Sequence, residues 1–121
     1  HNRFVEASKK VAPYREAIVS QIQRDGLDQT LLAGPVKVIV TFMFIRPKAH
    51  FGTRNKAPYL RDDAPRYVTR APDLDKIQRA LGDALTQGGI LTDDSLIVGW
   101  QARKMYGERY ETIIEVIPLF E

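Results

Sequence analysis

The strongest constraint on the fold of this 121-residue chain is the run from residue 36 to residue 45. It reads VKVIVTFMFI, is almost entirely β-branched, aromatic or aliphatic, and follows the turn-forming pair Gly34-Pro35. A bilayer-spanning helix needs ~20 apolar residues, so this run is too short to cross a membrane. It predicts a strand at the centre of a sheet, buried on both faces.

A helical pattern precedes this strand, over residues 7–24. Apolar side chains recur there at spacings of three and four, at Val11, Tyr14, Ile18 and Ile22. This spacing predicts an amphipathic helix. Pro13 either kinks the helix or marks its true beginning, and Gly26 is a suitable terminator.

A second helical pattern extends through Leu85 and ends at Gly88-Gly89. Its predicted buried stripe follows the i, i+3, i+4 rule and consists of Ile77, Ala80, Leu81, Ala84 and Leu85. Asp75 is the expected N-cap, with Asp73 just upstream on extended backbone. Asp75, Arg79 and Asp83 are four residues apart and share the opposite side of the helix.

Two further strands are predicted near the C-terminus, over residues 96–105 and 109–117. We therefore expect a single α+β domain over residues 1–121, in which two main helices pack on a mixed β-sheet. The chain has no cysteine, which excludes disulfides, thiolate metal sites and a cysteine nucleophile. With no signal-peptide pattern, a cytoplasmic location is expected.

The segment 46–70 lacks periodicity and is rich in basic side chains, although the formal net charge of the whole chain is only +3. We expect a loop whose cations hold a phosphate backbone. The candidate DNA-binding residues are Arg46, Lys48, Arg54, Lys56, Arg61, Arg66 and Arg70. Tyr59 and Tyr67 lie among them, and a solvated surface loop explains the composition equally well.

Carboxylates concentrate just after this basic segment. Asp73 and Asp75 lie two apart, and the glycine turn can fold Asp93 and Asp94 back toward them. Such a cluster is electrostatically costly unless a divalent cation binds to it, and Mg²⁺ prefers hard oxygen ligands. The structural alternative is an N-cap with a first-turn acid, followed by an ordinary Asp-Asp-Ser turn.

A longer pattern joins these two acidic segments. Its elements are Asp73-Leu74-Asp75, a helix ending in Asp83-Ala84-Leu85, the Gly88-Gly89 turn, Asp93-Asp94, and Lys104 one strand later. This pattern resembles that of the RusA family of Holliday junction resolvases. The resemblance implies a homodimeric, Mg²⁺-dependent enzyme, with Mn²⁺ as a second candidate ion, that nicks four-way DNA junctions symmetrically. It also suggests a phage or prophage origin.

Carried over by motif position, the resemblance makes Asp73, Asp75 and Asp94 the metal-binding and catalytic acids. Asp93 is a further candidate ligand, and Asp83 a supporting acid. The family often has asparagine where this chain has Lys76, and a functional lysine where it has Arg79. We expect Arg79 to stabilise the phosphate, while Lys76 or Lys104 can supply an ammonium group instead.

Three other sequence features carry expectations. The family's opening strand, rich in glycine, proline and basic residues, is missing before His1. His50 has no partner at metal-ligand spacing, and Trp100 fits a core or dimer-interface position better than a substrate contact.

Two alternatives to junction resolution stay open at this point. One is a metal-dependent nuclease acting on branched or flapped DNA in general. The other is a DNA-binding module without catalytic activity, whose acids are structural.

Overall fold

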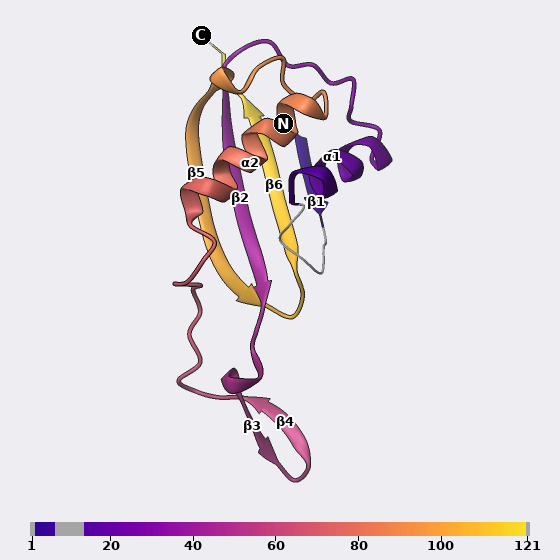
Figure 1. The fold of residues 1–121 in the computed structure, drawn as a ribbon. Helices are drawn as coiled ribbons and strands as arrows, with labels where there is room; N and C mark the ends of the chain where they lie inside the picture. Colours follow the sequence, from indigo (N-terminus) through magenta and orange to yellow (C-terminus); the bar gives the residue numbers. More distant parts are fainter. Residues whose placement is uncertain (1, 7–13, 121) are drawn as a thin grey trace.

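A mixed four-stranded sheet forms the body of the protein. The computed structural model describes residues 2–6 and 14–120. β2 (Val36–Ile45) pairs with β6 (Glu111–Pro118) in antiparallel and with β5 (Ile97–Gly107) in parallel orientation. β1 (Asn2–Glu6) pairs antiparallel with β6, which gives the order β1-β6-β2-β5 (Figure 1). The predicted α+β class, the two C-terminal strands and the central place of β2 are confirmed.

The strand β1 was not predicted. Its five residues pair with β6 in a register that runs from Asn2 opposite Val116 to Glu6 opposite Thr112. Five residues are too few for alternation to decide between strand and loop. An N-terminal strand is therefore present in the segment where the sequence indicated none.

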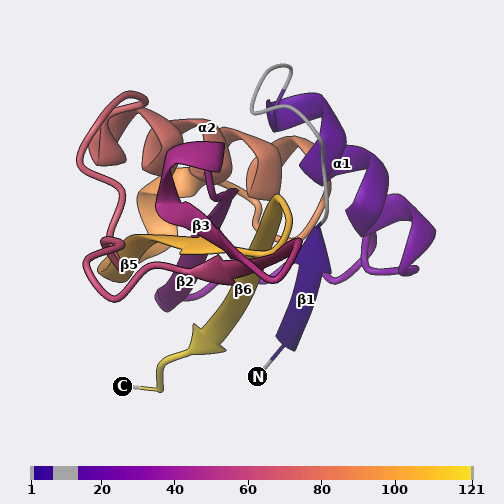
Figure 2. The ribbon, with the colours of Figure 1, turned by 90° about the horizontal axis from the view of Figure 1, so that it is seen from below.

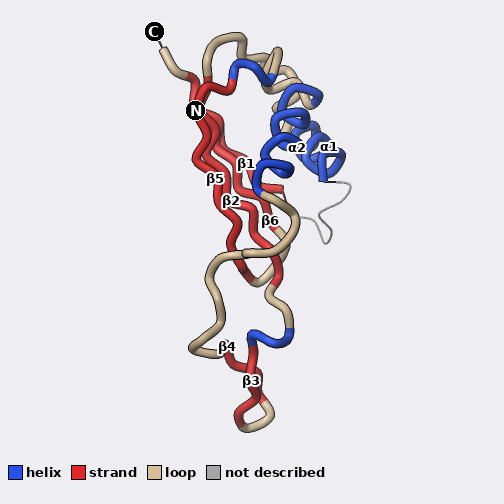
Figure 3. Tube along the Cα trace, turned by 60° about the vertical axis from the view of Figure 1, so that its left-hand side comes forward, coloured by secondary structure: helices blue, strands red, loops and turns tan. Residues whose placement is uncertain are grey.

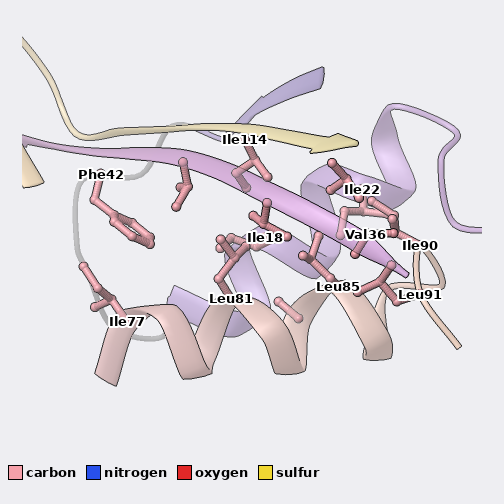
Figure 4. Packing of buried hydrophobic residues seen from close by; sticks show 14 residues of the cluster. Ile18, Ile22, Val36, Phe42, Ile77, Leu81, Leu85, Ile90, Leu91 and Ile114 are labelled. Atoms are coloured by element: carbon pink, nitrogen blue, oxygen red, sulfur yellow. The ribbon is translucent and has the colours of Figure 1, made fainter. Parts of the chain in front are cut away.

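Both helices cover the same face of the sheet (Figures 2 and 3). α1 (Tyr14–Arg24) and α2 (Leu74–Gln87) share one hydrophobic core with the alternate buried residues of β2. The part of the first predicted helix before Tyr14 lies outside the described residues. The core between the helices and the sheet contains Ile18, Ile22, Val36, Val38, Val40, Phe42, Ile77, Leu81, Ala84, Leu85, Ile90, Leu91, Ile114 and Val116 (Figure 4).

The expectation that β2 is buried on both faces is wrong. Its burial alternates: Val38 and Val40 are fully covered, whereas Ile39 and Thr41 on the other face are half-buried. The reason is that the described helices cover only one face. A nearly continuous apolar sequence shows that a strand is central, but not that both of its faces are covered.

As predicted, glycines terminate both helices. The second residue after each helix is a glycine with a left-handed backbone. Gly26 has φ +71° and Gly89 has φ +86°. After α1, the amide of Leu27 donates to the carbonyl of Ile22, and after α2 the amide of Ile90 donates to that of Leu85. These are the six-to-one hydrogen bonds of the Schellman motif, in which glycine avoids the steric cost of positive φ.

Segment 46–70, here called the arm, extends beyond the end of the sheet (Figure 1). The expectation of a loop without secondary structure is wrong, because the arm contains a 3-10 turn (Lys48–His50) and a hairpin of β3 (Phe51–Arg54) and β4 (Ala57–Leu60). Asn55 and Lys56 both have positive φ, as a two-residue type I′ turn requires. The hairpin escaped prediction because its strands are four residues long and β4 contains Pro58.

No helix in the described part of the chain is long and apolar enough to cross a membrane.

Candidate active site

Asp73 and Asp75 lie at the beginning of α2. Asp73, not Asp75, is the N-cap: its backbone is extended, with φ −65° and ψ 144°, and its carbonyl accepts the amide of Ile77. The predicted N-cap role of Asp75 is therefore wrong. Asp75 occupies the first turn, where its negative charge is favoured by the helix dipole.

Asp94 reaches the same region by a separate route. After the Gly88-Gly89 turn, the chain runs beside residues 30–32, where Leu32 and Leu91 form a parallel bridge. The amide of Thr92 donates to the carbonyl of Leu32, which fixes the direction of the next residues. Asp94 then begins a 3-10 turn (Asp94–Leu96) that leads into β5.

The two acidic segments meet in one open pocket between α2 and the beginning of β5. The pocket has a volume of about 260 Å³ and is lined by Asp75, Gln78, Arg79, Gly82, Asp94, Ile97 and Trp100. A Cβ added to Gly82 would lie 3.6 Å from the Cβ of Asp94, so Asp94 packs directly on the helix. The prediction that the glycine turn folds Asp93 and Asp94 back toward Asp73 and Asp75 is confirmed for Asp94 and Asp75, which share the pocket, whereas Asp73 and Asp93 do not line it.

Arg79 lines the same pocket as Asp75 and Asp94. Within the described residues it forms no ion pair of 4.0 Å or less, so its guanidinium is not occupied by Asp75 or Asp83. A guanidinium that is free of carboxylate partners can bind a phosphate with two parallel hydrogen bonds.

The other predicted acids have different surroundings. Asp73 is exposed and is not among the residues that line the pocket. The Asp93 carboxylate accepts a hydrogen bond from the Ser95 hydroxyl, within the turn. Asp83 lies 3.7 Å from Arg15 in an exposed ion pair that joins α2 to α1.

The two lysines also differ. Lys76 is exposed in the first turn of α2. Lys104 is half-buried on β5, and its Nζ donates to the carbonyl oxygens of Arg70 and Pro72, each at 2.8 Å. Two of its three N–H donors are therefore bonded to the main chain.

A divalent cation fits the donors of the pocket. Among the described residues no group of three or more histidine or acidic side chains is close enough to hold an ion alone. Mg²⁺ needs fewer, because it commonly binds to one or two carboxylates and fills its other positions with water and substrate phosphate. The pocket is lined by two acidic residues, Asp75 and Asp94, which is the number that such a site needs.

The base of the arm is a cluster around Arg46, one of the predicted DNA contacts. Its guanidinium donates to the carbonyl of Pro65 at 2.7 Å, lies 3.3 Å from Nδ1 of His50, and stacks 5.5 Å from the ring centre of Tyr106. The His50 ring meets Tyr106 edge-on. Desolvation, and then the positive charges of Arg46 and Arg70, lower the pKa of His50, while Asp63 raises it.

The cations farther along the arm are exposed. Arg54 stacks over the ring of Tyr59, 4.8 Å from its centre, and that ring packs on Gly52, where a Cβ would lie 2.6 Å away. Arg61 forms an exposed ion pair with Asp63 at 3.1 Å. The remaining exposed cations, which form no ion pair with another described residue, are Lys48, Lys56, Arg66 and Arg70.

The family model described as endodeoxyribonuclease RusA matches residues 2–117. The chain belongs to the RusA family. The match begins at the first residue of β1 and ends one residue before the end of β6, so it includes both helices, the arm and all of the sheet except Pro118. A comparison with curated proteins gave no significant match.

RusA membership makes this protein an endodeoxyribonuclease, a hydrolase that acts on DNA. RusA nucleases generally depend on a divalent metal, which agrees with the donors of the pocket.

Four pocket residues were not predicted as site residues: Gln78, Gly82, Ile97 and Trp100. Trp100 packs partly against the core, as expected, but it also lines the pocket. The sequence held one usable signal for Gln78: it lies three residues after Asp75, which places both on neighbouring turns of one helix face.

Proposed function

We propose that this protein is a Mg²⁺-dependent Holliday junction resolvase of DNA recombination and repair, which cuts a four-way junction by paired, symmetric nicks. The observation that carries the proposal is the pocket in which Asp75 and Asp94, from two separate chain segments, lie beside Arg79. The RusA family supports a branched DNA substrate.

The proposed site hydrolyses one phosphodiester bond in each strand that it cuts. Water adds to phosphorus and the bond to the 3′ oxygen breaks, which leaves a 5′ phosphate and a 3′ hydroxyl that takes up a proton. When bound, Mg²⁺ would supply Lewis-acid chemistry: it would polarise the phosphoryl oxygen, lower the pKa of water and stabilise the leaving oxygen. Asp75 and Asp94 would hold the ion, with Asp73 and Asp93 as outlying acids, and Arg79 would donate to the non-bridging oxygens.

The arm supplies the binding energy in this proposal. Its exposed cations neutralise phosphates, and such contacts do not depend on base sequence. Arg54 is the best prepared of them, because stacking on Tyr59 restricts its side chain before DNA binds. Arg46 acts mainly at the base of the arm, where its hydrogen bonds hold Pro65 and His50.

Paired nicks require two sites, so we propose a homodimer with two-fold symmetry, which presents identical pockets to strands of equal polarity. Analytical ultracentrifugation at nicking concentrations checks this: a monomer that still makes paired cuts contradicts it.

A panel of three DNA substrates tests the function. A synthetic four-way junction, a 5′ flap and a linear duplex are incubated with the protein in Mg²⁺, in Mn²⁺ and in Ca²⁺ at one salt concentration. The proposal predicts symmetric nicks in the junction and little cutting of the duplex. Equal cutting of all three indicates a broader nuclease, and binding without cutting in any ion indicates a DNA-binding module.

A further inference from the structure

Lys104 connects the edge of the sheet to the main chain just ahead of the acidic helix. Its Nζ donates to the carbonyl oxygens of Arg70 and Pro72, at 2.8 Å each. The main chain of the same region adds two bonds, from the Val68 amide to the Lys104 carbonyl at 3.4 Å and from the Tyr106 amide to the Arg66 carbonyl at 3.0 Å. Segment 66–72 is thereby attached to β5 over its whole length.

The side-chain bonds of Lys104 lie next to the candidate metal site. Pro72 directly precedes Asp73, the N-cap of α2, and Asp75 follows in the first turn. The Asp73 side chain makes no capping hydrogen bond to α2. The beginning of the helix therefore lacks the usual side-chain cap, and Lys104 holds the residues just before it instead.

Asp94 is held by a different set of contacts. It follows the Gly88-Gly89 turn and the bridge between Leu32 and Leu91. The separation of the Asp75 and Asp94 carboxylates thus depends on how two segments are held: the first turn of α2, and the turn at Asp94, which packs on the same helix at Gly82. A small shift of either one changes the geometry available to a shared cation, and Mg²⁺ demands nearly ideal octahedral geometry.

We infer that Lys104 is a positioning residue, which fixes the beginning of α2 so that Asp75 faces Asp94 at the spacing that a divalent cation requires. The inference rests on the proposed function, because it assigns these two acids to the ion. It replaces the expectation that Lys104 supplies an ammonium group to the substrate, since two of its three donors are bonded to carbonyl oxygens.

Three substitutions isolate this role. Lys104→Met keeps a long unbranched side chain but removes both donors. Lys104→Arg keeps the charge and offers several N–H donors to the two carbonyls. Lys37→Met is the matched control, because it removes the same charge from the neighbouring strand β2, where the Lys37 side chain lies against Gly99.

Cation affinity is the first readout, measured without DNA by calorimetric titration of Mn²⁺ and by the melting temperature at increasing Mn²⁺. We expect Lys104→Met to weaken Mn²⁺ binding by about 10-fold, the lower end of the loss that follows removal of a group bonded directly to a metal ligand, because Lys104 acts on Asp75 only through the main chain. Lys104→Arg is expected to stay close to wild type, and Lys37→Met to equal it. The Mg²⁺ concentration for half-maximal nicking rises in parallel, while junction binding in Ca²⁺ changes no more than in Lys37→Met.

Amide hydrogen exchange of the metal-free protein is the second readout. The Ile77 amide, which donates to the Asp73 carbonyl, is expected to exchange faster in Lys104→Met than in Lys37→Met. This measurement does not depend on the proposed function.

The outcomes separate the two proposals. Unchanged Mn²⁺ affinity and unchanged exchange in Lys104→Met overturn the role of Lys104, while a wild-type protein that binds Mn²⁺ and nicks junctions preserves the proposed function. Equal losses of cation and junction binding, without rescue by arginine, also overturn it, since they indicate general disruption of the fold. A wild-type protein that neither binds Mn²⁺ nor cuts DNA contradicts the proposed function, and the assignment of Lys104 with it.

Discussion

Among the glycines, Gly89 is the position where a single added methyl group is expected to lower the free energy of unfolding most. It follows α2 with φ +86°, and a Cβ there would lie 1.9 Å from the Asp28 carbonyl oxygen. Its own carbonyl accepts the amide of Leu31. Gly89→Ala therefore forces two packed backbone segments apart at the turn that directs Asp94 into the pocket.

Gly26 provides the matched control for the magnitude. It follows α1 with φ +71°, and a Cβ there would have no atom within 4 Å. Alanine in the left-handed region costs about 1–2 kcal/mol, and its effect on the unfolded chain returns a few tenths or more. We therefore expect Gly26→Ala to lower the free energy of unfolding by about 1 kcal/mol. Gly89→Ala adds an overpacking cost of about 1–3 kcal/mol, for a total of about 3 kcal/mol.

Urea denaturation at 25 °C measures both variants, with equal slopes required for a valid comparison. At about 4 °C per kcal/mol, the melting temperature is expected to fall by ~4 °C for Gly26→Ala and by ~12 °C for Gly89→Ala. Equal losses in the two variants would refute the reasoning, because the larger loss expected for Gly89→Ala comes from the close contact with Asp28, which Gly26 lacks.

Three further predictions concern the core, the pocket and the arm. Leu81 is fully buried beneath the sheet, so Leu81→Ala is expected to lower the free energy of unfolding by about 3–5 kcal/mol, as measured by urea denaturation. Gly82→Ala is expected to raise stability by about 1 kcal/mol in the same assay, since its methyl group meets Asp94 at an ordinary 3.6 Å; a loss would contradict that geometry. Because the folded protein lowers the pKa of His50 below 6.5, the unfolded chain binds the proton more readily. The contribution of His50 to the free energy of unfolding is therefore present above pH 6.5 and is lost as the pH falls below it. The melting curves of wild type and His50→Gln are thus expected to converge in acid. A constant difference between them from pH 8 to pH 5 would contradict this.

Elements with a strong local pattern were predictable from the sequence. The β2 run is long and apolar, and the helices carry both a periodic stripe and a terminal glycine. β1 and the arm hairpin were missed because strands of four or five residues have too little pattern and depend on their partners. The half-exposed face of β2 depends on where the helices pack, which its own sequence does not determine.

The candidate site was also predictable only in part from the sequence. The family resemblance suggested Asp73, Asp75 and Asp94. The fold brings Asp75 and Asp94 to one pocket, which Asp73 does not line. Spacing did not reveal that Asp83 pairs with Arg15 on α1, because that contact depends on helix packing. The bonds of Lys104 were equally hidden, since carbonyl oxygens are present at every residue and leave no mark in a sequence.

The central claim is that the pocket shared by Asp75 and Asp94 is where DNA is cut. Its most direct test is the nicking rate of a four-way junction in Mg²⁺ by Asp75→Asn and by Asp94→Asn, with junction affinity measured in Ca²⁺. Asp25→Asn is the control, because it makes the same charge change at an exposed site beyond the end of α1. We expect both pocket variants to bind the junction but lose at least about 100-fold in nicking rate, because weaker metal binding removes a Lewis acid that stabilises the transition state by several kcal/mol, while Asp25→Asn cuts like wild type. Full nicking by both pocket variants would contradict the account.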